Sequence, residues 1–105
     1  MQVQQGDTTY ETVEALPEGS VKVAPGELGY VVMHGESGHT HVIKETSPDI
    51  CELYIKDEVL YVRAIKPTEI SHEEHHTQTL DPGIWKVGQV NEFDYMQKMA
   101  RKVID

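Results

Sequence analysis

Five of the six histidines of this 105-residue chain fall in two short segments. The first segment reads GHTH over residues 38–41, and the second reads SHEEHH over residues 71–76. Imidazole nitrogens and carboxylate oxygens are common ligands of divalent transition metals. Two alternatives to a metal site are a solvated polar loop edge and a pH sensor. The second is open because histidine titrates near neutrality. A metal site is predicted only if folding brings the two segments together.

The spacing within each segment suits chelation. On a strand, His-x-His places both rings on one face, about 6.6 Å apart along the strand, and His-x-x-His in a loop or helical turn can also bring two rings together. The sequence therefore predicts a divalent metal site with the ligands His39, His41, His72 and His75. Glu74 is the candidate fifth ligand or general base, and Glu45 or Glu73 would orient the rings.

The remaining candidates receive plainer interpretations. His34 is expected to end a strand, and His76 is a reserve ligand because in an extended chain it points away from its neighbour His75. Cys51 is expected in the core, away from both segments. Without a thiolate ligand, the donors suit Zn(II), Fe(II), Mn(II) or Ni(II).

Two hairpins are predicted to carry this chemistry. Residues 28–34 (LGYVVMH) and 39–45 flank a glycine-rich turn, and alternation puts His41 and Ile43 on the opposite face from Val42 and Lys44. Residues 50–55 and 59–65 flank a charged connection, and the second arm is apolar on both faces, which predicts a central, covered strand. A further strand is expected after the turn at residues 81–83.

The last dozen residues change to helical spacing. Met96, Met99, Ala100 and Val103 form an apolar stripe, with Asp94 as a candidate N-cap. The predicted fold is one mainly all-β domain over residues 1–105, a small β-barrel or sandwich with one short C-terminal α-helix.

Composition limits the partners. The chain has 18 acidic and 9 basic side chains and a formal charge of −9, which argues against nucleic acid or an anionic membrane as a partner. The single cysteine and the absence of a leader-like start favour the cytoplasm. A metal ion, a small-molecule substrate and, through an exposed sheet edge, a second copy of the chain are the expected partners. The alternative function is a non-enzymatic acidic interaction module, phage-encoded, that binds a host protein.

The run His39, His41, Glu45 resembles the HxHxxxE first motif of the cupins, small metal-binding β-barrels. The turn Pro82-Gly83 is similar to the turn of their second motif, although here His72 and His75 precede it. The resemblance implies a cupin-like barrel with a metal centre. The chain departs from the first motif at Met33 and Glu52, where cupins usually have glycine.

A second resemblance covers nearly the whole chain. Small uncharacterised proteins of bacteria and their phages share a pattern that corresponds here to Gly6-Asp7, Leu16-Pro17-Glu18-Gly19, GESGHTH, SHEEH, LDPGIWKV and NEFD. The resemblance implies that His39, His41, His72, Glu74 and His75 form one functional unit. It implies no particular activity.

Overall fold

The computed structural model describes residues 1–34, 40–73 and 75–89. Its strands are β1 (Gln2–Gln5), β2 (Thr8–Val13), β3 (Val21–Val23), β4 (Tyr30–His34), β5 (Thr40–Ile43), β6 (Cys51–Lys56), β7 (Val59–Ala64), β8 (Thr68–Ile70), β9 (Gln78–Leu80) and β10 (Gly83–Gln89). Within these ranges there is no helix, and the all-β class is confirmed. The predicted C-terminal helix, with Asp94 and Met96, lies outside the described residues. No described helix is long and apolar enough to span a membrane.

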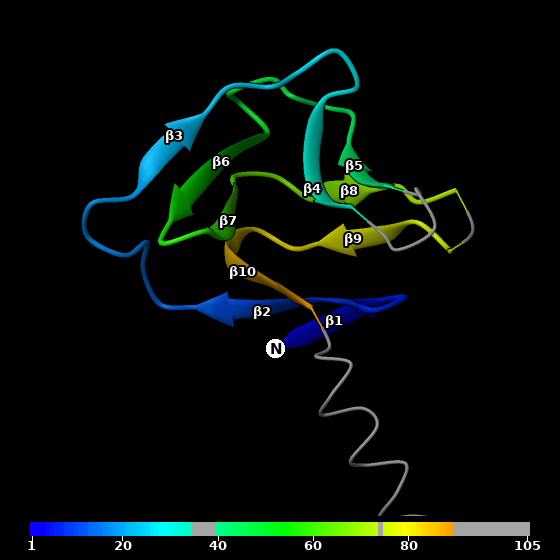
Figure 1. The fold of residues 1–105 in the computed structure, drawn as a ribbon, viewed down its shortest axis with the longest axis horizontal. Coiled ribbons are helices and arrows are strands. Elements are labelled where there is room, and N and C mark those ends of the chain that lie inside the picture. The colour runs from blue at the N-terminus through cyan, green and yellow to red at the C-terminus, as the bar shows by residue number, and fades with distance from the viewer. Residues whose placement is uncertain (35–39, 74, 90–105) are drawn as a thin grey trace, which may run out of the picture.

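The strands form one large sheet and two small ones (Figure 1). The six-stranded sheet has the order β1-β2-β10-β7-β6-β3, while β4–β5 and β8–β9 are two-stranded. In the described part of the chain the large sheet ends at β1 and β3, so of the two predicted architectures, barrel or sandwich, a closed barrel does not form. The physical reason is that the two small sheets, β4–β5 and β8–β9, pack over the inner face of the large sheet instead of joining its edges.

Both predicted hairpins are present. β4 pairs with β5, with a register shift between Val31 and Met33. β6 pairs with β7 through a two-residue turn in which Asp57 and Glu58 have φ values of 50° and 66°. Positive φ at both central residues is typical of a type I′ turn, whose twist matches that of the flanking strands.

β7 is central, as predicted, between β10 and β6. The expectation that both its faces are covered is wrong. Val62 and Ala64 are buried, whereas Arg63 is exposed and Ile65, just past the strand, is 42% exposed. A charged side chain on the second face keeps that face in water, even though its neighbours are apolar.

The core lies between the large sheet and the two small ones. Its residues come from all three sheets: Tyr10, Tyr30, Val32, Ile43, Cys51, Leu53, Val62, Ala64, Ile70, Leu80, Trp85 and Val87. Cys51 is fully buried, as predicted. The Trp85 indole N–H donates to the Asp81 carbonyl oxygen at 2.8 Å, which ties the start of β10 to the preceding turn.

One short bridge joins the two small sheets. The backbone N–H of Val42 donates to the Ser71 carbonyl at 2.9 Å, and that of Ser71 donates to the Val42 carbonyl at 2.8 Å. In an antiparallel pair, each residue before one partner faces the residue after the other. The bridge therefore places His41 directly opposite His72.

Candidate metal centre

Three histidine rings lie in a row at this bridge. The ring centroids of His41 and His72 are 4.3 Å apart, and those of His72 and His75 are 4.5 Å apart. We call His41, His72 and His75 the histidine row. The long-range convergence of the two segments, on which the sequence prediction depended, is present for these three residues.

The row runs from the core to the surface. His41 is 1% exposed, His72 is half-buried and His75 is exposed. The alternation predicted for the strand explains the depth of His41, since His41 and Ile43 both point into the core.

The His41 ring is oriented by Gln5 of β1. The Gln5 amide N–H₂ donates to the carbonyl oxygens of Ile70 and His76, both at 2.9 Å. With its nitrogen assigned to two acceptors, Gln5 presents Oε1 to His41 Nδ1 at 2.7 Å. Because Oε1 can only accept, Nδ1 of His41 must carry a proton. In the neutral ring the lone pair is then on Nε2.

The Nε2 atom of His41 faces the β1–β2 turn. Thr8 Oγ1 lies 3.1 Å from it, and Asp7 Oδ1 lies 4.0 Å from it. Burial lowers the pKa of His41 below its ordinary value, and the neighbouring His72 lowers it further, while Asp7 acts in the opposite direction. The lowered pKa keeps the ring neutral at pH 7, which is the form that binds a metal.

The second segment is fastened to β5 beside the row. The Thr40 backbone N–H donates to the Glu73 carboxylate at 3.2 Å. The His75 backbone N–H donates to His72 Nδ1, also at 3.2 Å. A neutral His72 therefore carries its proton on Nε2. It loses this hydrogen bond whichever nitrogen becomes the ligand, because Nδ1 must then either bind the metal or take up the proton.

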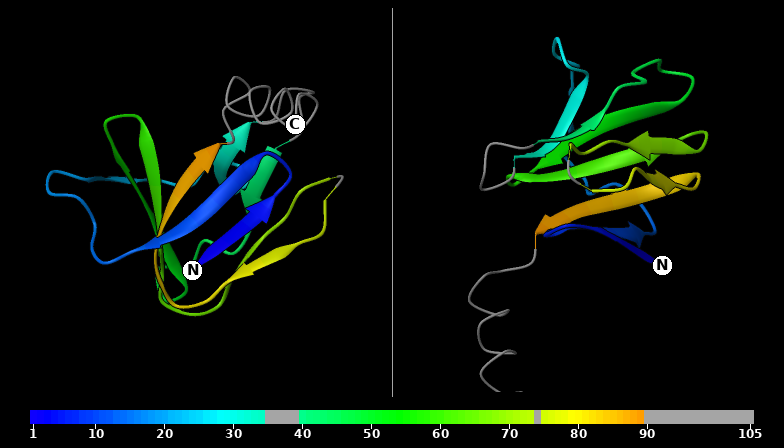
Figure 2. Two further views of the ribbon diagram at one scale, coloured as in Figure 1. Left: turned by 90° about the horizontal axis from the view of Figure 1, so that it is seen from below. Right: turned by 90° about the vertical axis from the view of Figure 1, so that its right-hand side faces the viewer.

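The outer ring of the row packs on the β1–β2 turn. Gly6 has a φ of 61°, and a Cβ at this position would lie 2.6 Å from His75 Nε2. Glycine is required here both for the backbone conformation and for the close approach of the ring. As a result the turn residues Gly6, Asp7 and Thr8 lie along the row. Figure 2 shows this N-terminal hairpin alongside β9, which follows the second histidine segment.

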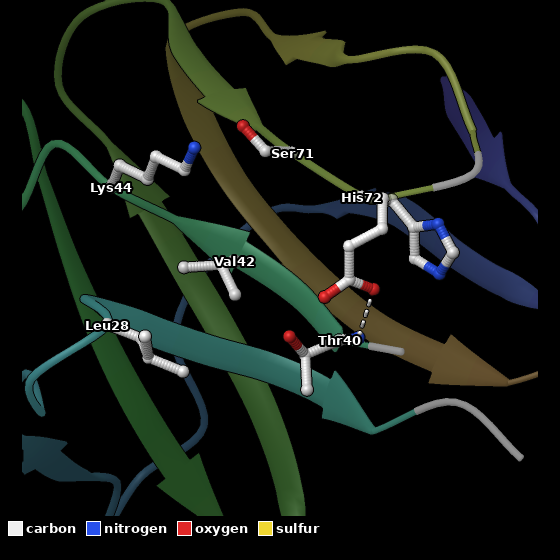
Figure 3. A pocket seen from close by; sticks show the side chains of 7 residues that line it. Leu28, Thr40, Val42, Lys44, Ser71 and His72 are labelled. Carbon is white, nitrogen blue, oxygen red and sulfur yellow. Dashed lines mark hydrogen bonds between the residues drawn. The ribbon is translucent and has the colours of Figure 1, made fainter. Parts of the chain in front are cut away.

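A pocket of about 230 Å³ lies on the other face of β5 (Figure 3). Its lining residues are Leu28, Thr40, Val42, Lys44, Ser71, His72 and Glu73. The ring of His72 is turned away from Val42 and Leu28. Only His72 belongs to both the lining of this pocket and the histidine row.

The predicted site residues are thus brought together in part. His41, His72 and His75 converge, whereas His39 and Glu74 lie outside the described residues. Glu73 fastens the second segment to Thr40. Glu45 is exposed beyond the end of β5, and its backbone carbonyl accepts a hydrogen bond from the Cys51 thiol. His34 ends β4, as predicted, and His76 is exposed.

Across the described ranges, no three His, Cys, Asp or Glu side chains already surround a common point that could hold a metal ion. The ring planes of His41 and His72 are tilted by 45°, and those of His72 and His75 by 37°. Two imidazoles bound to one tetrahedral zinc at 2.0–2.1 Å have centroids about 5 Å apart. Each neighbouring pair of the row therefore needs to separate by less than about 1 Å and to rotate. The outer rings, His41 and His75, must instead approach each other before one ion can bind all three.

Three polar residues at the site were not predicted: Gln5, Asp7 and Thr8. Gln5 is 2% exposed and Thr8 is fully buried. Gly6-Asp7 was part of the pattern on which the second resemblance was based, and this was the available signal. The pattern did not reveal that the turn would pack against the histidines.

Comparison with known proteins gives one match. A family model described as a domain of unknown function, DUF8820, matches residues 4–89. This range includes the whole β1–β2 turn and both histidine segments. No curated protein and no solved structure matches the chain.

Proposed function

The chain belongs to the DUF8820 family of domains of unknown function, and we propose that it binds a divalent metal ion through the histidine row. The observation that carries the proposal is the state of His41. Its Nδ1–H is held by Gln5, so that in the neutral ring Nε2 carries the lone pair, at the inner end of the row. Metal-binding histidines commonly have their second nitrogen held in this way.

The proposed ligands are His39, His41, His72 and His75, with Glu74 as fifth ligand or general base. His41 and His75 have the strongest support. His41 is held in one orientation, and the exposed His75 ring can turn without breaking a buried contact. His72 joins them at the expense of the hydrogen bond from the His75 backbone.

The donor set favours Zn(II), Fe(II), Mn(II) or Ni(II). Imidazole nitrogens and carboxylate oxygens suit these ions, whereas Cu(I) prefers sulfur ligands. The thiol of Cys51 is buried in the core and donates to the Glu45 carbonyl, so it is not part of the proposed set.

Binding has more support than catalysis. The pocket of about 230 Å³ could hold a small molecule, but it lies across β5 from His41. A substrate in the pocket would reach the row only through His72. The alternative function, an acidic module that binds a host protein, rests on the net charge of −9 and the small size of the chain.

Calorimetric titration of Zn(II) into tag-free protein stripped with EDTA tests the proposal. We expect one ion per chain. His75→Ala should weaken binding more than about 100-fold, because loss of an outer-shell partner alone weakens binding 10–100-fold. His76→Ala is the matched control, since His76 is an adjacent exposed histidine, and it should bind as the wild type does. Wild-type protein without a zinc site, or equal affinity in both variants, would refute the proposal.

A further inference from the structure

We propose that Asp7, in the β1–β2 turn, is an additional ligand of the histidine-row site and that Gln89 of β10 positions its carboxylate. This inference rests on the proposed metal-binding function. It assigns the site an anionic oxygen donor from a third segment of the chain.

The carboxylate of Asp7 is held through the oxygen that does not face His41, just as the His41 ring is held through the nitrogen that does not face Asp7. Gln89 Nε2–H donates to Asp7 Oδ2 at 3.1 Å, which leaves Oδ1 facing His41 Nε2 at 4.0 Å. On the other side, Gln5 holds His41 through Nδ1 at 2.7 Å. Two glutamine side chains from different strands therefore aim a carboxylate oxygen and an imidazole nitrogen at each other.

The distance between these two atoms is close to what a shared ion requires. Two ligands bound at 2.0–2.1 Å with a tetrahedral angle are about 3.3–3.4 Å apart. Asp7 Oδ1 and His41 Nε2 need to approach by only about 0.6 Å to reach this separation. The hydroxyl of Thr8, 3.1 Å from His41 Nε2 and 3.5 Å from Asp7 Oδ1, would release its hydrogen bond to the ring.

The difference in exposure between Asp7 and His41 gives the ion a path from water to the imidazole. The Asp7 side chain is 40% exposed and that of His41 is 1% exposed. An ion enters from water at the carboxylate and is held at the imidazole. The ring of His75 packs over Gly6, the residue next to Asp7, so a third donor stands at the same turn.

This arrangement explains two features that a purely structural histidine row leaves unexplained. A buried neutral His41 needs no carboxylate nearby, and the turn needs no side-chain hydrogen bond from β10. His41, His75 and Asp7 would supply two nitrogens and one carboxylate. This set of ligands is used for zinc and for iron(II), with coordination positions left for water or a further ligand.

The test is titration of EDTA-stripped protein with Co(II), followed by visible absorption. Asp7→Asn removes the charge and keeps the shape. We expect it to weaken Co(II) binding more than tenfold and to change the absorption spectrum, while the Tm in EDTA stays within about 2 °C of the wild type. Gln89→Leu should weaken binding less than Asp7→Asn and keep the wild-type spectrum. Asp57→Asn, a charge removal at the tip of another hairpin turn, is the matched control and should change neither.

The outcomes separate the two proposals. Asp7→Asn with wild-type Co(II) affinity and spectrum overturns the role of Asp7, while the histidine site stands if His75→Ala still abolishes binding. Wild-type protein that binds neither Co(II) nor Zn(II) overturns both. If Asp7→Asn unfolds in EDTA, Asp7→Ser, a second variant without the carboxylate, takes its place. Weaker Co(II) binding with a changed spectrum then supports the role of Asp7, and wild-type affinity and spectrum overturn it.

Discussion

Replacement of Gln5 by methionine tests the hydrogen-bond network under the histidine row. The two side chains have similar length, but Met lacks the amide. The change leaves the His41 Nδ1–H and the Ile70 carbonyl without their partners, and both hydrogen bonds are buried. A third partner, the buried Tyr10 hydroxyl, loses only a long contact of 3.5 Å to Gln5 Oε1. The fourth, the His76 carbonyl, is only partly buried and can turn to water.

The expected cost follows from these contacts. Each buried polar group that loses its partner costs about 1–3 kcal/mol, so two cost about 2–6 kcal/mol. Burial of an apolar side chain returns about 1.5–3 kcal/mol. The net expectation is a loss of about 2 kcal/mol in the free energy of unfolding, out of a total of about 5–15 kcal/mol for a domain.

Urea denaturation in EDTA, followed by the fluorescence of the single tryptophan, Trp85, measures this loss. Gln4→Met is the matched control, since Gln4 is exposed and donates only to the carbonyl of Gly6 in the adjoining turn. It should cost no more than about 0.5 kcal/mol. If Gln5→Met is as stable as Gln4→Met, then Gln5 does not hold His41, and the tautomer argument for its Nε2 lone pair is lost.

Three further predictions concern the fold. Gly29→Ala should lower the free energy of unfolding by at least about 2 kcal/mol, because Gly29 has a φ of 108° and a Cβ would collide with the Ile43 carbonyl. Its control is Gly26→Ala, where the atom nearest to an added Cβ is 3.8 Å away. That variant should lose less than about 0.5 kcal/mol in the same urea assay. The thiol of Cys51 is fully buried, and burial raises its pKa. Its reaction with a disulfide reagent should therefore be very slow at pH 7, faster at higher pH and fast in urea. A fast reaction in native buffer would contradict the burial. Glu58→Gly should raise stability by up to about 1 kcal/mol by relieving its φ of 66°, and a lower Tm would show that the turn is not strained at this residue.

Local patterns predicted a large part of the fold. Strand alternation gave both hairpins, the strand at Gly83–Gln89 and the inward direction of His41, because side-chain period and turn chemistry are local properties. The coverage of β7 was predicted wrongly because apolar content does not reveal which face lacks a packing partner. The choice between barrel and sandwich stayed open in the sequence, and a closed barrel does not form in the described residues, because sheet closure depends on how the hairpins pack against each other.

The sequence predicted the histidines of the site but not the polar residues of β1–β2 that contact them. The histidines identify themselves by type and spacing. Gln5, Asp7 and Thr8 do not, because glutamine, aspartate and threonine are common in polar segments. They gain their roles only when β1–β2 packs against His41, 33 or more positions later, and against still more distant residues. The bridge between Val42 and Ser71 that sets His41 against His72 is likewise a tertiary event.

The side chain of Gln5 spans 65 residues of sequence to Ile70 and 71 residues to His76. Contacts between such distant positions form late in folding, since the chain must first close the intervening loop. During synthesis, β1 is made before these acceptors and stays unpaired with them until residue 76 has followed. The His41 imidazole therefore acquires its final tautomer only after that point, and a nascent chain that ends earlier should have no more affinity for a metal ion than its scattered histidines provide.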